Sequence, residues 1–203
     1  MSRIEAIIFD LGNVLINFDW GVAEKNLDKI KQNLGNHSQK YFRDHPELII
    51  ELEKGQISDL AFLEKCRLEL EFDCSSEELA KIFSQIFSPN QKLIDKLKSL
   101  AERVDLYLLS NTNAIHKQYG WGDFNFIKYF KQLFLSYQIG FVKPEVEIYK
   151  YVEERINLDR ESFIYIDDIL DYVSSAANLG WNAIHFENNQ SLMNKLKEYK
   201  VLQ

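Results

Sequence analysis

Hydrophobic residues follow two different patterns along this chain. Short continuous apolar runs bounded by polar residues or glycine are typical of buried strands in a parallel sheet. Such runs occur at 4–9, 105–109, 132–136, 162–166 and 182–186. Apolar residues at helical spacing separate the later runs and predict helices at 91–101, 145–156, 173–179 and 190–199. This alternation predicts an α/β protein whose mostly parallel sheet carries helices on both faces.

A long helical segment follows the first strand. Apolar residues recur at helical spacing in 22–34, 46–53, 59–70 and 76–87, and the segment shows no strand pattern. Ser58, and either Ser75 or Ser76, precede two of these helices and are expected to cap their N-termini. We therefore expect an α/β core domain formed by 1–15 and 90–203, with a helical cap domain, 16–89, inserted after the first strand.

Composition narrows the class of protein. The 203 residues carry a formal net charge of −7, which argues against a nucleic-acid-binding protein. No run approaches the ~20 apolar residues of a membrane span, and the N-terminus lacks the apolar segment of a signal peptide. Cys66 and Cys74 are expected to be free thiols, and no Cys or His spacing fits a zinc site. We expect a cytoplasmic protein without a nucleic-acid or membrane partner.

Polar side chains follow the predicted strands at the points where those strands end. Asp10 ends the first strand and Ser110-Asn111 the second, while Lys143 follows the third. Asp167 and Asp168 end the fourth. Ligands of parallel α/β sheets bind beyond the carboxyl ends of the strands. These groups are therefore expected to converge at one edge of the sheet.

The combination of groups favours phosphoryl transfer. Three carboxylates in one cleft repel one another, and a hard cation such as Mg²⁺ relieves this repulsion through oxygen ligands. A lysine, a hydroxyl and backbone N–H groups are what a dianionic phosphate requires. The pattern predicts Mg²⁺-assisted phosphoryl transfer in which Asp10 attacks phosphorus and becomes an aspartyl-phosphate.

Each group taken alone has a simpler explanation. Asp10 and the Asp167-Asp168 pair are compatible with ordinary turns, and Ser110 to Thr112 with a helix cap. Lys143-Pro144 is compatible with a solvated turn. The histidines are scattered without metal spacing, and His116 is the one nearest in sequence to the Ser110 loop.

Four motifs in order resemble those of the haloacid dehalogenase-like hydrolase superfamily over essentially the whole chain. They are Phe9-Asp10-Leu11-Gly12-Asn13-Val14-Leu15, Leu109-Ser110-Asn111-Thr112-Asn113, Lys143-Pro144 and Ile166-Asp167-Asp168. The helical insertion resembles the cap of that superfamily's first cap class. Within the superfamily, the chain resembles bacterial α-glucose-1-phosphate phosphatases, which share the Asp-Leu-Gly-Asn-Val, Leu-Ser-Asn-Thr-Asn and Lys-Pro-Glu runs. The resemblance implies a Rossmann-like core sheet.

The resemblance also implies roles for individual residues. Asp10 would be the nucleophile and a metal ligand, and the backbone carbonyl of Gly12 and the Asp168 carboxylate would bind Mg²⁺, with Asp167 beside them. Ser110, Asn111 and Lys143 would hold the phosphoryl group, and Lys143 would take part in catalysis. The implied substrate is a sugar phosphate such as glucose-1-phosphate.

Two positions depart from the superfamily pattern. Most of its phosphatases carry an acid/base Asp two residues after the nucleophile, where this chain has Gly12. That Asp would typically contribute about 10²- to 10⁴-fold to the rate. Tyr172 replaces the usual Asn or Asp four residues after Asp168, and Asp171 lies one place earlier.

The sequence thus predicts a Mg²⁺-dependent phosphatase of small phosphorylated metabolites, acting as a monomer or weak homodimer. Gly12 and Tyr172 motivate an alternative, a weakly active or inactive phosphate-binding protein with a regulatory role. A third hypothesis is another reaction of the superfamily, such as that of a phosphomutase or a dehalogenase.

Overall fold

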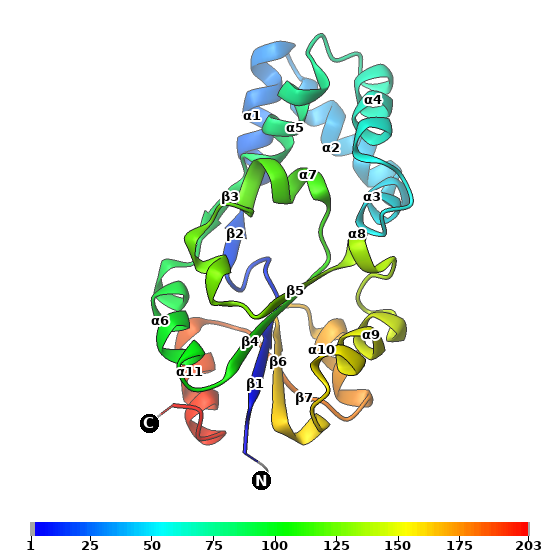
Figure 1. The fold of residues 1–203 in the computed structure, drawn as a ribbon. Coiled ribbons are helices and arrows are strands. Elements are labelled where there is room, and N and C mark those ends of the chain that lie inside the picture. Colours follow the sequence, from blue (N-terminus) through cyan, green and yellow to red (C-terminus); the bar gives the residue numbers. More distant parts are fainter. Residues whose placement is uncertain (1–2, 203) are drawn as a thin grey trace.

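A five-stranded parallel sheet forms the centre of the molecule. The computed structural model describes residues 3–202, and the sheet lies in the half that holds both termini (Figure 1). Its strands are β1 (Ala6–Phe9), β4 (Asp105–Ser110), β5 (Gln132–Leu135), β6 (Phe163–Asp167) and β7 (Asn182–His185). They are ordered β5-β4-β1-β6-β7. The predicted α/β fold is confirmed.

The first strand lies at the centre of the sheet, and both of its neighbours lie far away in sequence. Ile7 of β1 pairs with Leu106 of β4 on one side and with Ile164 of β6 on the other. All four residues of β1 are fully buried. A strand covered on both faces reads as a continuous apolar run, which is why the sequence pattern identified it.

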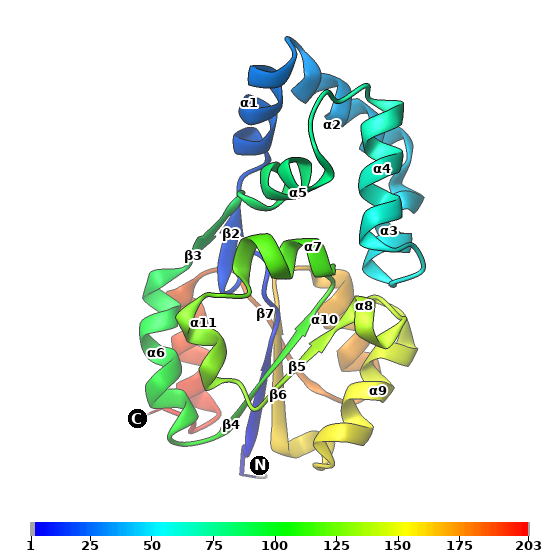
Figure 2. The ribbon, with the colours of Figure 1, turned by 45° about the horizontal axis from the view of Figure 1, so that its top comes forward.

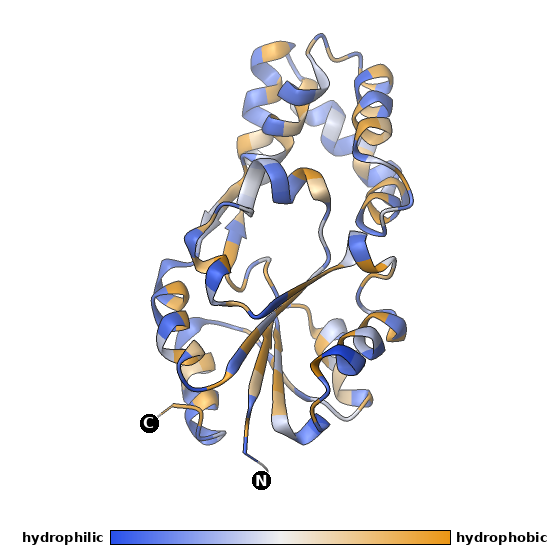
Figure 3. Ribbon diagram, viewed as in Figure 1, coloured by the Kyte–Doolittle hydropathy of each residue, from blue (hydrophilic) through white to orange (hydrophobic). Residues whose placement is uncertain are grey.

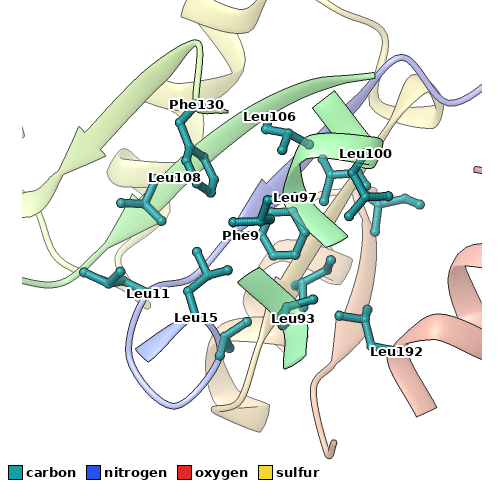
Figure 4. Packing of buried hydrophobic residues seen from close by; sticks show 14 of the residues in the cluster. Phe9, Leu11, Leu15, Leu93, Leu97, Leu100, Leu106, Leu108, Phe130 and Leu192 are labelled. Atoms are coloured by element: carbon teal, nitrogen blue, oxygen red, sulfur yellow. The ribbon is translucent and has the colours of Figure 1, made fainter. Parts of the chain in front are cut away.

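Helices cover both faces of the sheet. On one face, α6 (Gln91–Ala101) and α11 (Asn189–Glu198) pack through leucines against Phe9 and its neighbours (Figure 4). On the other face, α9 (Val146–Ile156) and α10 (Leu170–Asn178) contribute to a second buried cluster. Figure 3 shows the resulting hydrophobic strands between helices whose outer faces are hydrophilic.

Short helical elements follow two of the strands at the end nearer to the inserted helices. The chain leaves β4 into α7 (Ala114–His116) and a π-turn over Lys117–Trp121, followed by a 3-10 helix over Asn125–Tyr129. It leaves β5 into α8 (Ser136–Ile139), which ends at Gly140 with a φ of 91°. A last 3-10 turn, Arg160–Ser162, precedes β6.

Five helices form a separate layer above the sheet edge, and we call them the cap. They are α1 (Trp20–Ile30), α2 (Leu34–Asp44), α3 (Pro46–Glu53), α4 (Asp59–Glu69) and α5 (Ser76–Ser84). The Ser58 and Ser75 side chains accept hydrogen bonds from backbone N–H groups in the first turns of α4 and α5, so both predicted N-caps are confirmed. Figure 2 shows the cap joined to the core near β2 and β3.

The single helix predicted over 22–34 is wrong, because the chain forms two helices there. Helix α1 ends at Ile30, and Asn33 adopts a φ of 67° before α2 begins. The Asp28 carboxylate then accepts a hydrogen bond of 2.8 Å from the Gly35 N–H. A Cβ at Gly35 would lie 2.8 Å from the Glu24 backbone, so this glycine permits the two helices to pack closely.

Two short strands that the sequence did not predict connect the cap to the core. β2 (Ile16–Phe18) and β3 (Phe87–Pro89) pair antiparallel, with Ile16 opposite Pro89 and Phe18 opposite Phe87. The chain therefore enters and leaves the cap at adjacent points.

The cap has its own buried cluster, which includes Leu34, Phe62 and Phe83. Ile115 of α7 completes this cluster from the core side. Cys66 and Cys74 are both free, as expected. Within residues 3–202, the structure contains no helix with the length and hydrophobicity needed to cross a membrane.

Candidate active site

The polar residues that follow the strands come together in one cleft. Asp10, Ser110, Asn111, Lys143 and Asp168 all line a cavity of about 250 Å³ at the carboxyl edge of the sheet. The cavity lies between this edge and the cap, because residues of both line it. Asp167 lies next to the cavity and is fully buried. The convergence that the strand ends predict is thus present.

Lys143 lies at the centre of this cluster. Its ammonium group donates hydrogen bonds of 2.6 Å to Asp10 Oδ1 and 2.7 Å to Asp167 Oδ2, and one of 3.3 Å to the Leu109 carbonyl. The Lys143 side chain is 1% exposed, and those of Asp10 and Asp167 are 8% and 0% exposed. A buried ammonium requires such partners, since an unpaired buried charge is strongly unfavourable.

Burial and neighbouring charges shift the pKa values of Asp10 and Lys143. Burial raises the pKa of Asp10 to about 7, and the Asp167 carboxylate adds to this rise while Lys143 opposes it. Burial acts to lower the pKa of Lys143, but Asp10 and Asp167 more than offset this and leave it raised. Lys143 is therefore a cation at neutral pH, able to attract an anionic group into the cleft.

Asp167 holds Lys143 in place. Its Oδ2 accepts hydrogen bonds from Lys143 and from the Tyr165 hydroxyl, and its Oδ1 accepts one of 2.8 Å from the Ile169 N–H. Both of its oxygens are therefore used inside the protein, and the geometry favours a positioning role.

The carboxylates of Asp10, Asp167 and Asp168 form a cluster suited to a hard cation. Each offers an oxygen, and these oxygens lie within 4.8 Å of one another. Asp168 is half-buried. Burial raises its pKa, and a hydrogen bond of 3.2 Å from Asn13 offsets only part of this rise. Oxygen donors at the mouth of a cleft suit Mg²⁺, which retains several waters. The residues present therefore fit the metal that the sequence predicts.

Asn111 and Ser110 shape the wall opposite Asp168. The Asn111 side chain accepts a hydrogen bond of 2.8 Å from the Lys143 N–H and donates one of 3.0 Å to the Lys143 carbonyl. It therefore fixes the backbone that carries the lysine. The Ser110 hydroxyl lines the cavity and donates a long hydrogen bond of 3.3 Å to the Asn111 carbonyl, which a rotation of the hydroxyl would exchange for one to a bound anion.

Tyr172 occupies the place of the expected Asn or Asp. Its ring lies 5.1 Å from the Lys143 ammonium, a cation–π distance, and its hydroxyl is 3.5 Å from the Asn111 amide nitrogen. Asp171 is exposed and does not line the cavity. Tyr172, and not Asp171, therefore faces the lysine.

Gly12 leaves open the space that an acid/base side chain would occupy. A Cβ added there would lie 3.4 Å from the Phe18 ring and 3.9 Å from Asp10 Oδ2, distances of ordinary contact. Gly12 itself lines the cavity. The site thus has room for a Cβ at this position.

The cap and the strand that leads to it contribute residues that the sequence did not predict. Trp20 and Glu53 of the cap and Phe18 of β2 line the cavity. Burial raises the pKa of the Glu53 carboxyl to about 7, with Lys143 opposing the rise. No local sequence signal marks Glu53, because its place in the cleft depends on how α3 packs on the core.

Helix α3 lies beside α8 (Figures 1 and 2), and two close approaches join the residues that follow α3 to the core. Lys54 and Glu145 form an ion pair of 2.5 Å. Gly55 has a φ of 65°, and a Cβ there would lie 2.3 Å from the Tyr137 carbonyl oxygen. These close approaches hold the end of α3 over the cleft.

His116 lies where α7 meets the cap. Its ring centroid is 4.5 Å from that of Phe83 and 5.1 Å from that of Phe87. Burial lowers its pKa to about 4, so it is neutral at pH 7. Its Nε2 is buried and has no hydrogen-bond partner in the part of the chain that the structure describes.

Comparison with known proteins places these features in a family. The family of haloacid dehalogenase-like hydrolases matches residues 4–180. The chain is 26% identical over 196 residues to a D-ribitol-5-phosphate phosphatase of Bacteroides thetaiotaomicron, covering 91% of this chain and 93% of that protein. It is 25% identical over 213 residues to a sesquiterpene phosphatase of Aspergillus oryzae, covering 97% of each.

A solved structure shows the same arrangement of elements. It is that of a HAD family enzyme from Bacteroides thetaiotaomicron in complex with magnesium and inorganic phosphate. The two structures superpose with a TM-score of 0.82 at 29% identity, over 94% of this chain and 98% of the other.

Proposed function

The chain belongs to the haloacid dehalogenase-like hydrolases, and from this premise we propose that it is a Mg²⁺-dependent phosphatase of small phosphomonoesters. The observation that carries the proposal is the buried Lys143 ammonium bound to Asp10 and Asp167. The ammonium lies where a phosphoryl group would meet both a cation and a carboxylate nucleophile. A similar structure that contains magnesium and inorganic phosphate supports the assignment.

Asp10 is the proposed nucleophile. A carboxylate oxygen of Asp10 forms a bond to phosphorus, the bond between phosphorus and the ester oxygen breaks, and the leaving alkoxide takes a proton. Water then attacks the aspartyl-phosphate, releasing inorganic phosphate and restoring the Asp10 carboxylate. Lys143 and the Ser110 hydroxyl would hold the phosphoryl oxygens, and Asn111 would hold Lys143 and its loop in place.

The proposed metal ligands are Asp10, Asp168 and the backbone carbonyl of Gly12, with Asp167 beside them. When bound, Mg²⁺ would neutralise charge on the phosphoryl oxygens and orient them toward Asp10. The oxygens of the three carboxylates lie close enough together to bind one cation, which supports this assignment.

Glu53 is the proposed source of the proton that Gly12 cannot supply. It lines the cleft from the cap, and its pKa of about 7 suits a general acid at neutral pH. Its carboxyl would protonate the leaving oxygen when the cap is closed over the substrate. The ion pair between Lys54 and Glu145 supports this placement by holding the adjacent residue on the core.

The test is release of inorganic phosphate from a panel of esters, with and without Mg²⁺. The panel holds glucose-1-phosphate, which the sequence resemblance suggests, together with ribitol-5-phosphate, an isoprenyl phosphate and p-nitrophenyl phosphate. We expect Mg²⁺-dependent release that falls by at least about 10³-fold in Asp10→Asn. Full activity of Asp10→Asn would overturn the proposed nucleophile.

The same assay separates the alternatives. Tight binding of a phosphorylated ligand without phosphate release would favour the regulatory phosphate-binding protein that Gly12 motivates. An isomerised sugar phosphate without free phosphate would indicate a phosphomutase, and halide release from a haloacid would indicate a dehalogenase. We further propose that the protein is cytoplasmic and is a monomer or weak homodimer. Size-exclusion chromatography with light scattering would test the oligomeric state.

A further inference from the structure

A second cavity, of about 290 Å³, lies within the cap. The cap helices α1 to α5 all contribute to its wall, and α7 closes it on the core side. Its lining is dominated by apolar side chains, among them Leu27, Phe42, Phe62, Leu63, Leu79 and Phe83. Native cores are normally packed without such voids, so a cavity of this size requires an explanation.

The cap cavity adjoins the candidate active site. Trp20, Glu53 and His116 line both cavities, so these residues form the boundary between them. A molecule whose phosphoryl group lies against Lys143 would reach the cap cavity by extending past these residues. Two adjacent cavities, one lined by charged groups and one mainly apolar, are suited to a ligand with one charged end and one apolar end.

Two polar side chains that line the cap cavity, those of Ser38 and Gln39, are already hydrogen-bonded within the protein. The Ser38 hydroxyl donates a hydrogen bond of 2.8 Å to the Leu34 carbonyl. The Gln39 amide donates one of 3.1 Å to the Glu24 carboxylate. Away from Glu53 and His116 at the boundary, a sugar placed here would find few polar partners for its hydroxyl groups, which is unfavourable. The cavity therefore disfavours a polyol and favours hydrocarbon.

His116 at the boundary does not oppose an apolar chain. Its ring lies among Trp20, Phe83 and Phe87, with centroid distances of 6.1, 4.5 and 5.1 Å. It carries no charge at neutral pH because burial lowers its pKa to about 4. Its Nε2 has no hydrogen-bond partner among the described residues and remains available to a polar atom of the ligand.

We propose that the cap cavity holds the apolar group of the substrate, so that the natural substrate is a phosphomonoester of an aliphatic or isoprenoid alcohol. The proposal rests on the phosphatase function proposed above. At ~30 Å³ for each water-sized group, the cavity accommodates about ten carbon atoms. The alcohol parts of geranyl and decyl phosphate each contain ten carbon atoms.

The test compares wild-type hydrolysis of ethyl, butyl, hexyl, octyl, decyl and tetradecyl phosphate in the presence of Mg²⁺, below their micelle concentrations. We expect kcat/KM to rise by about fourfold per methylene, the factor for a fully buried CH₂. The rise should stop near ten carbons. A kcat/KM that is flat or falls with chain length, while p-nitrophenyl phosphate or glucose-1-phosphate is hydrolysed, overturns the proposal but leaves the phosphatase intact.

A pair of adjacent variants locates the effect. Ala23 lines the cavity and is 6% exposed, whereas its neighbour Val22 does not line it and is 36% exposed. Ala23→Phe should lower the ratio of kcat/KM for decyl phosphate to that for ethyl phosphate by at least about tenfold, and Val22→Phe should leave this ratio unchanged. Equal ratios in the two folded variants would also overturn the proposal.

Calorimetry with decylphosphonate decides the case in which no ester is hydrolysed. That outcome would contradict the proposed phosphatase function, and binding alone would then test the cavity. Tighter binding of decylphosphonate than of ethylphosphonate to the wild-type protein, lost in Ala23→Phe, would support the apolar site. Equal binding of the two phosphonates would contradict it.

Discussion

Lys54, directly after cap helix α3, and Glu145 of the core form an ion pair of 2.5 Å between the two parts of the molecule. Their side chains are 18% and 34% exposed. Glu145 also accepts a hydrogen bond of 3.0 Å from the Val142 N–H, directly before Lys143. The position of the cap is thus coupled to the loop that carries the lysine.

Removing this ion pair should loosen the closed arrangement. Partly exposed pairs contribute ~0.2–1 kcal/mol, so Lys54→Ala should lower kcat/KM by up to about fivefold. The measurement is steady-state phosphate release at low and high salt, since screening should reduce the difference between wild type and variant. Lys31→Ala is the control, because the pair of Lys31 with Glu71 lies within the cap. An equal loss in both variants would contradict a role for the Lys54 contact.

Gly55→Ala should disturb the same contact more strongly. Gly55 has a φ of 65°, and an added Cβ would lie 2.3 Å from the Tyr137 carbonyl oxygen. Gly140→Ala is a matched control, since its φ is 91° but nothing lies within 4 Å of the added Cβ. Each variant incurs ~1–2 kcal/mol of backbone strain, and Gly55→Ala alone adds the clash. Urea unfolding and phosphate release should therefore show a larger loss for Gly55→Ala.

Glu53→Gln should affect esters according to their leaving groups. An alkoxide needs a proton to leave, whereas p-nitrophenolate leaves readily without one. We expect kcat to fall by about 10²- to 10⁴-fold for an alkyl phosphate and by much less for p-nitrophenyl phosphate. Glu51→Gln, an exposed change on the same helix, is the control. Equal losses for both esters would point to a positioning role.

An acid restored at position 12 provides a second readout. Because the site has room for a Cβ at Gly12, Gly12→Asp should recover part of the alkyl phosphate activity in the Glu53→Gln background. Recovery confined to alkyl esters would identify the lost function as proton donation. No recovery in a folded double variant would contradict it.

Glu53 should also make stability depend on pH in the metal-free protein. Burial raises its pKa in the folded state from 4.5 to about 7, so the folded state holds a proton that the unfolded state releases. Its contribution to stability is fully present below pH 4.5 and is lost as the pH rises to about 7. Urea unfolding at pH 4.5, 6 and 8 should therefore show a smaller decrease in Glu53→Gln than in wild type. Parallel curves would show that Glu53 is not buried as described.

The sequence predicted the sheet and the convergence of polar residues because the same residues carry both signals. Asp10 and Asp167 each follow an apolar run buried on both faces, so strand and site could be found together. The cap was harder. The break between α1 and α2 has no Pro or Gly at its turn, and it depends on Asp28 bonding to Gly35.

Contacts between residues far apart in the sequence explain why β2, β3 and the position of Glu53 were not predicted. β2 and β3 have only three residues each and are strands only because Ile16 and Phe18 lie opposite Pro89 and Phe87. Glu53 enters the cleft only because α3 packs on α8. Neither relationship leaves a periodic signal in the local sequence, so each becomes visible only in three dimensions.

The pairing of β2 with β3 bears on how such a protein can change its specificity. Because Ile16 and Pro89 lie opposite each other, the chain departs from the core and returns to it at nearly one point. The inserted cap segment is therefore connected to the core at one place. We expect that replacing it with the cap of another family member would change the substrate specificity, while the strand order and the arrangement of Asp10, Asp167 and Lys143 stay unchanged.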